Sequence, residues 1–112
     1  MYSDFVEQLF KDPNDIEIDP NKLNLMHATF GISGEAGELL DSVKKHIVYG
    51  QELDLENVKE ELGDLEFYLE AFRQAVGLDR MSIIEHNVDK LKLRYPEGYS
   101  DKSARERLDK NE

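Results

Sequence analysis

The chain has 112 residues, and 25 acidic against 14 basic side chains give it a formal net charge of -11. This charge repels the phosphate backbone of nucleic acids, so a nucleic-acid polymer is not an expected partner. Cysteine is absent and no apolar run approaches the roughly 18 residues that span a membrane, so we expect a cytoplasmic protein without disulfides or a membrane partner.

The spacing of apolar residues predicts helices from the N-terminus onwards. Phe5 and Leu9 share one face of a short amphipathic helix, which the sequence DPND at 12–15 interrupts. Asp19 is followed by proline, and this pair is typical of an N-cap and the first helical position. A long helix is therefore expected from there to the residue before Gly50, since glycine commonly follows the end of a helix.

Two further long helices follow in the sequence. Asp54 is placed to cap the first of them, which we expect to end near Gly77. The second begins at Asp79 or Ser82, and both remain possible N-caps from the sequence. This helix is expected to end before Pro96, because the residue preceding a proline disfavours the helical conformation.

The predicted elements indicate an all-α fold. Residues 1–100 are expected to form the domain, and residues 101–112 are expected to form a polar C-terminal tail or a loosely docked arm. The apolar arcs of the long helices are too broad for a three-helix monomer of this size to cover. We therefore expect a helical bundle that is completed by assembly into a homodimer or homotetramer.

Two carboxylates of the second long helix lie where charges are unusual. With Leu55 as the reference and about 100° per residue, the apolar side chains occupy an arc of roughly 200–340°. Glu61 falls at about 240°, inside this arc, and Asp64 falls at about 180°, on its margin. Ionised carboxylates in such positions are costly unless a positive charge joins them.

The first long helix carries a matching pair of carboxylates. Glu35 and Glu38 are three residues apart, so both lie on one edge of the helix beside its apolar side. If the two helices pack antiparallel, this pair can converge with Glu61 and Asp64. Four hard oxygen ligands without histidine or cysteine suit Mg²⁺, with Mn²⁺ as a possible substitute.

A basic face follows on the third long helix. Asn87, Lys90 and Arg94 share a face, and together they could hold phosphate oxygens; the alternative is a solvated stripe. Lys44 and Lys45, just beyond Glu38, are further candidates, although they can also serve as favourable charges near a helix C-terminus.

Three segments resemble a known family. GISGEAGELLDSVKK, KEELGDLEFYL and NVDKLKLRYPEGYS, in this order over about residues 25–100, are similar to the MazG-like NTP pyrophosphohydrolases. The resemblance implies an all-α fold, a dimer or a dimer of dimers, and Mg²⁺ held by Glu35, Glu38, Glu61 and Asp64. It implies phosphate-side contacts from Asn87, Lys90, Arg94 and Tyr95. Phe67 stands where the family often has tryptophan.

The reaction implied by this resemblance is hydrolysis of an NTP or dNTP to the monophosphate and pyrophosphate. Either Glu35 or Glu38 could accept the proton of the attacking water, and the sequence does not choose between them. His27 and Phe30, two to three turns before these acids, could contact the base of the nucleotide. The alternative for both residues is packing in the core.

Two other functions fit parts of the sequence. An acidic helical interaction protein that mimics DNA would suit the net charge, but it needs its acids on exposed faces. A di-iron carboxylate bundle requires Glu-x-x-His motifs. None of the three histidines has an acid three residues before it, since those positions hold Asn24, Val43 and Ile83.

Overall fold

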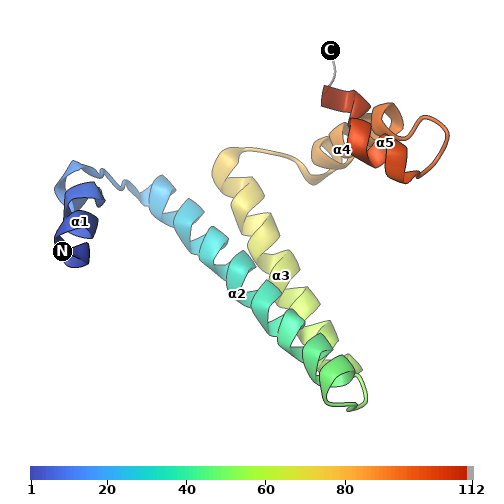
Figure 1. Cartoon of the computed structure of the whole chain (residues 1–112), viewed down its shortest axis with the longest axis horizontal. Helices are drawn as coiled ribbons and strands as arrows, with labels where there is room; N and C mark the ends of the chain where they lie inside the picture. The colour runs from blue at the N-terminus through green and yellow to red at the C-terminus, as the bar shows by residue number, and fades with distance from the viewer. Residues whose placement is uncertain (111–112) are drawn as a thin grey trace.

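The computed structural model describes residues 1–110, and within this range it contains helices and no β-strand (Figure 1). The all-α fold class predicted from the sequence is therefore confirmed. The elements in chain order are α1 (Tyr2–Leu9), the 3-10 turn η1 (Pro13–Asp15), α2 (Pro20–Val48), α3 (Leu55–Val76), α4 (Arg80–Arg94), α5 (Asp101–Glu106) and the 3-10 turn η2 (Leu108–Lys110).

Aspartate side chains fix the start of each long helix. The carboxylate accepts a hydrogen bond from the backbone N–H three residues later, at 2.8 Å for Asp19, 3.1 Å for Asp54 and 3.2 Å for Asp79. Such caps satisfy backbone donors that have no partner inside the helix. Asp79, and not Ser82, is thus the N-cap of α4. Gly77 ends α3 in the left-handed conformation with a φ of 69°.

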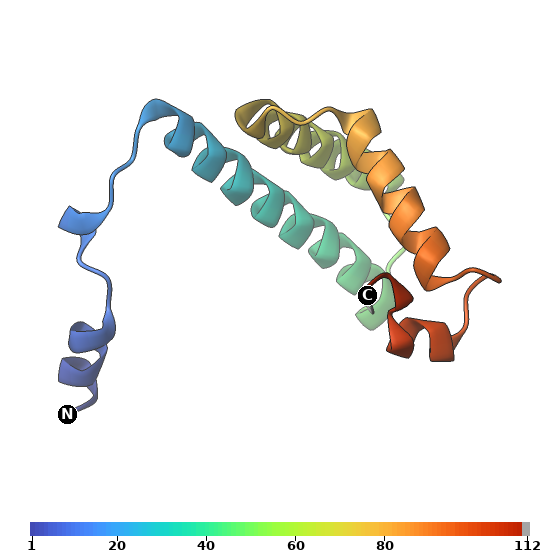
Figure 2. The same ribbon diagram turned by 90° about the horizontal axis from the view of Figure 1, so that it is seen from above.

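Helices α2 and α3 form an antiparallel hairpin, and they lie side by side in both views (Figures 1 and 2). Ala28 of α2, with 2% of its surface exposed, is the buried apolar residue that the structure describes. Glu61 of α3 is buried as well, at 8% exposure. The hairpin interface therefore encloses a carboxyl group where an apolar side chain is usual.

One glycine allows the hairpin to close near its aromatic end. A Cβ atom added to Gly31 of α2 would overlap the ring of Tyr68 on α3. The absence of a side chain thus lets the tyrosine ring lie against the backbone of α2. Gly34, one turn further along α2, has open space around its Cβ position.

The remaining helices stand away from the hairpin. Helix α1 lies apart from α2 in both views, while α4 packs against α5 and η2 (Figures 1 and 2). The radius of gyration is 19.8 Å, whereas a compact domain of this length has about 13 Å. Many large apolar side chains are exposed, including Phe30, Leu62 and Phe67. No helix in residues 1–110 has both the length and the apolar character needed to cross a membrane.

The C-terminal residues fold back onto α4. Asp109 of η2 accepts two hydrogen bonds from the guanidinium of Arg94, at 2.8 Å from Nε and 3.2 Å from Nη2. The Asp109 side chain is only 3% exposed, so the ion pair is largely shielded from solvent. Within residues 101–110 the structure has α5 and η2, and the Arg94–Asp109 ion pair joins η2 to α4. Residues 111–112 lie outside the described residues.

We expect Gly31→Ala to lower the free energy of unfolding by about 1–3 kcal/mol, because the added methyl group must displace Tyr68. Gly34→Ala is the matched control, and it should raise stability by up to about 1 kcal/mol through helix propensity alone. Thermal and urea denaturation of both variants measure the difference. A loss of stability in Gly34→Ala as large as that in Gly31→Ala would contradict this account of α2.

Candidate metal centre between α2 and α3

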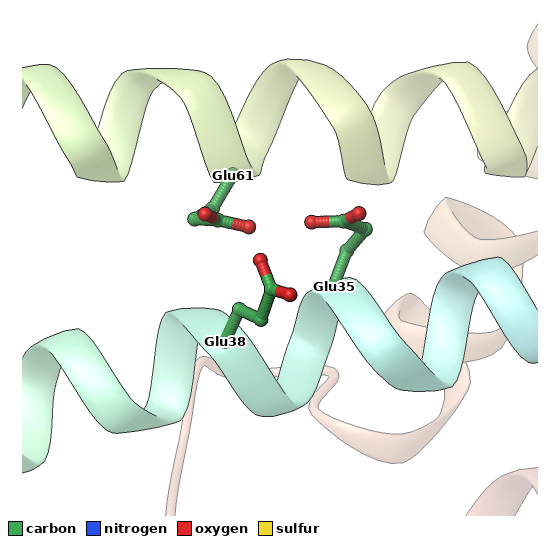
Figure 3. A group of neighbouring side chains, drawn as sticks. All are labelled: Glu35, Glu38 and Glu61. Atoms are coloured by element: carbon green, nitrogen blue, oxygen red, sulfur yellow. The ribbon is translucent and has the colours of Figure 1, made fainter.

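Three carboxyl groups meet in the middle of the hairpin. Glu35 and Glu38 extend from successive turns of α2, and Glu61 extends from α3 towards them (Figure 3). One oxygen atom from each of the three residues lies within 4.8 Å of the others. The convergence of these three residues, expected from helix phase, is therefore present in the structure. We call them the acid cluster.

The acid cluster contains oxygen atoms without a hydrogen-bond donor. The Oε2 atoms of Glu35 and Glu61 are both buried, and neither has a hydrogen-bond partner. Buried polar atoms in proteins are nearly always satisfied, so an orphaned pair calls for an explanation. Two ionised carboxylates in this position repel each other unless a proton or a cation joins them.

The surroundings of Glu61 raise its pKa to about 8, from an ordinary value of 4.5. The largest cause is the adjacent carboxyl group of Glu35, with which a protonated Glu61 can form a hydrogen bond. Burial of Glu61 and the proximity of Glu38 act in the same direction. Without a cation, the acid cluster therefore retains a proton at neutral pH.

Asp64 is not part of the acid cluster. It lies one turn beyond Glu61 on α3, and its side chain is exposed. Its position on the margin of the apolar arc accounts for this difference from Glu61, which points into the hairpin. The chain thus gathers three of the four predicted ligands, with the fourth on the adjacent turn.

A polar cavity of about 520 Å³ opens beside the acid cluster, and we call it the turn-side cavity because it extends towards the turn between α2 and α3. Lys45, a predicted phosphate contact, lines it together with Glu38 and Glu61. The ammonium group of Lys45 is 3.0 Å from the carboxylate of Asp41. Lys44 is directed elsewhere, with its Nζ atom 5.9 Å from the centre of the Tyr49 ring.

A second cavity, of about 330 Å³, lies on the other side of the acid cluster, and we call it the aromatic cavity. His27, predicted as a base contact, lines it with Phe67 and Tyr68, and the His27 and Tyr68 ring centres are 6.0 Å apart. Asn21, Asn24 and Gln74 add amide groups that the sequence reasoning missed. Phe30 is not among the lining residues, and its side chain is exposed.

The basic face of α4 lies outside the hairpin. Asn87 is exposed, and Lys90 lines a separate cavity with Asp109. The guanidinium of Arg94 is paired with Asp109, and this pairing holds the pKa of Asp109 below its ordinary value. Tyr95 follows the end of α4, with its ring 5.4 Å from that of Tyr99. Within the described chain, α4 makes no extended contact with α2 or α3.

Comparison with known proteins identifies one family. The family model described as the MazG nucleotide pyrophosphohydrolase domain matches residues 25–99, which is more than half of the chain. The matched range includes α3, α4 and the part of α2 that carries Glu35 and Glu38. No curated protein and no solved structure matches the chain.

The pKa of Glu61 predicts how the metal-free protein responds to pH. Because the pKa of Glu61 is raised in the folded state, the favourable contribution of this group to the free energy of unfolding is complete below about pH 4.5. It is lost as the pH rises through about 8. Glutamine has nearly the shape of a protonated glutamate and cannot ionise. The Glu61→Gln variant should therefore be as stable as wild type in acid and more stable than wild type above pH 8. Urea denaturation in EDTA across this range measures the effect. Glu60→Gln, an exposed neighbour, is the control, and an equal pH dependence in wild type and Glu61→Gln would contradict the prediction.

Proposed function

The chain belongs to the MazG nucleotide pyrophosphohydrolase family, and we propose that it hydrolyses an NTP or dNTP to the monophosphate and pyrophosphate with Mg²⁺ as cofactor. The observation that carries this proposal is the buried pair of carboxyl oxygens of Glu35 and Glu61, which have no hydrogen-bond donor. A bound cation would satisfy both atoms and remove the repulsion between them.

The ligand set fits a hard divalent cation. Glu35, Glu38 and Glu61 offer carboxylate oxygens, and Asp64, on the next turn of α3, would complete the set. Oxygen ligands alone favour Mg²⁺ or Mn²⁺ over the metals that prefer nitrogen or sulfur. When bound, the metal neutralises charge on the triphosphate and stabilises the pyrophosphate leaving group.

The carboxylates of α2 are assigned separate roles. Glu38 is exposed at the mouth of the turn-side cavity, where water can reach it, whereas one oxygen of Glu35 is buried. We therefore assign the general base to Glu38, which takes the proton of the water that attacks the α-phosphorus. Glu35 then serves mainly as a ligand that is fixed by its position against Glu61.

The aromatic cavity suits the base of the nucleotide. His27, Phe67 and Tyr68 provide ring surfaces, while the amides of Asn24 and Gln74 can donate and accept hydrogen bonds at the edge of a base. Small-molecule sites commonly combine such ring surfaces with polar groups that fix the orientation of the ligand. Phe67 is 68% exposed in the single chain, so a ligand or a second copy is needed to cover it.

We further propose that the working protein is a homodimer or homotetramer. The open shape and the exposed apolar side chains support assembly, because a monomer of this size rarely leaves so much apolar surface in water. Lys90 and Arg94 lie on α4, which has no extended contact with the hairpin of the same chain. The phosphate contacts expected from α4 are therefore assigned to a neighbouring copy.

The alternative of an acidic DNA mimic receives less support. Such a protein presents its carboxylates to solvent, whereas Glu61 is buried and Glu35 is half-buried in the hairpin. A cytoplasmic location remains an expectation from the sequence.

Purified protein with Mg²⁺ should convert at least one NTP or dNTP into the monophosphate and pyrophosphate, and EDTA should abolish the reaction. Glu38→Gln should reduce kcat by about 100-fold or more, because the general base is lost. Chromatography of the nucleotide products together with a pyrophosphate assay gives the result. Orthophosphate as the primary product would exclude the proposed reaction.

Complementation between inactive chains tests the shared site. Glu61→Gln and Lys90→Ala should each impair hydrolysis alone. When they are co-expressed in equal amounts, about half of the dimers are mixed and each has one intact site, so roughly a quarter of wild-type activity should return. Light scattering on the same samples gives the assembly size. A 13.0 kDa species, or no recovery of activity in mixed dimers, would contradict a site shared between copies.

A further inference from the structure

The acid cluster lies between two cavities of different chemistry. On α2, His27 of the aromatic cavity precedes Glu35, whereas Ser42 and Lys45 of the turn-side cavity follow Glu38. On α3 the order is reversed, with Asn57 before Glu61. Because the helices are antiparallel, each cavity draws residues from both helices, and the acids separate the two cavities. At about 1.5 Å per residue, Lys45 lies roughly 10 Å along α2 from Glu38.

We propose that the turn-side cavity holds the departing pyrophosphate as its metal complex, through Lys45, Ser42 and Asn57. This inference rests on the proposed function, and it adds the direction in which the substrate lies along the hairpin. With the base in the aromatic cavity and the α-phosphorus at the acid cluster, the β- and γ-phosphates extend towards the α2–α3 turn.

The polar groups of this cavity are arranged to donate hydrogen bonds. The side-chain amide of Asn57 donates to the hydroxyl oxygen of Ser42, and both residues are half-buried. A hydroxyl group that accepts one hydrogen bond keeps its own proton for another acceptor. Ser42 can therefore donate to a phosphate oxygen without losing its contact with Asn57.

Lys45 can change partner at little cost. Its ion pair with Asp41 is 55% exposed at both side chains, and such surface pairs contribute about 0–1 kcal/mol. A phosphate offers a higher charge and several acceptor oxygens, so the ammonium group gains by turning towards it. Lys45 also lines the adjoining cavity of about 310 Å³ with Gln51 and Glu52, which leaves room for this movement.

The wall of the turn-side cavity leaves space for a ligand. Gly34 and Gly37 line it, and nothing lies within 4 Å of the position that a Cβ atom would occupy on either residue. The cavity also contains Glu38, Asp41 and Glu61, so free pyrophosphate would be repelled. Binding should therefore require the divalent cation, which makes the metal complex of pyrophosphate the ligand.

Thermal denaturation tests this subsite without relying on turnover. Wild-type protein with Mg²⁺ should show a higher Tm when inorganic pyrophosphate is added, and also when nucleoside monophosphates are added. In Lys45→Ala, about tenfold more pyrophosphate should be needed for the same rise in Tm, whereas the response to nucleoside monophosphates should stay intact. Phe67→Ala should instead weaken the monophosphate response and leave the pyrophosphate response intact. Lys44→Ala removes the same charge outside the cavity, so it should retain both responses.

The outcomes separate the subsite from the reaction. Hydrolysis of a nucleoside triphosphate by wild type, together with an unchanged pyrophosphate response in Lys45→Ala, would overturn the subsite alone. Equal weakening of the pyrophosphate and monophosphate responses in Lys45→Ala would also overturn it. A selective loss of the pyrophosphate response, in a protein that hydrolyses no triphosphate, would support the subsite and overturn the proposed function.

Discussion

Repulsion among the carboxyl groups of Glu35, Glu38 and Glu61 is the constraint on which this structure depends. The three groups lie between two helices whose packing brings one oxygen from each within 4.8 Å of the others. The neighbouring carboxyl group of Glu35, together with burial of Glu61, raises the pKa of Glu61. The hairpin must hold this geometry against the repulsion, and close packing of Gly31 against Tyr68 is one contact that does so.

Few other contacts of the described chain support that geometry. Apart from the α2–α3 contact, its helices share little interface, and Ala28 is the buried apolar residue that the described structure contains. A domain of this size normally buries about two thirds of the surface that its unfolded chain exposes. Assembly would bury the exposed arcs of α2 and α3 and bring α4 of one copy near the acids of another. Folding, assembly and formation of the site would then depend on the same contacts.

Local signals in the sequence were sufficient for most of the fold. The caps at Asp19, Asp54 and Asp79 act over three residues, and the burial of Glu61 follows from its phase on one helix. Contacts between residues that are distant in the sequence cannot be predicted from such local signals. The hydrogen bond from Asn57 to Ser42 joins residues 15 positions apart across a turn, and no periodicity marks it. Asp64, predicted as a ligand from the margin of the apolar arc, is exposed and lies outside the acid cluster, because a small rotation of a helix decides whether a marginal side chain faces the partner or solvent.

The ion pair between Arg94 and Asp109 has a practical consequence for work with shortened chains. Residues 101–110 are polar enough in sequence to look dispensable, yet Asp109 neutralises a half-buried guanidinium at the end of α4. Trimming this segment would uncover an arginine on the face expected to meet phosphate, and it would leave that guanidinium without its carboxylate partner. The Arg94 guanidinium of a trimmed protein could then pair with an anion, including a phosphate buffer, in place of Asp109. Anion affinities measured on a trimmed protein would therefore differ from those of the whole chain.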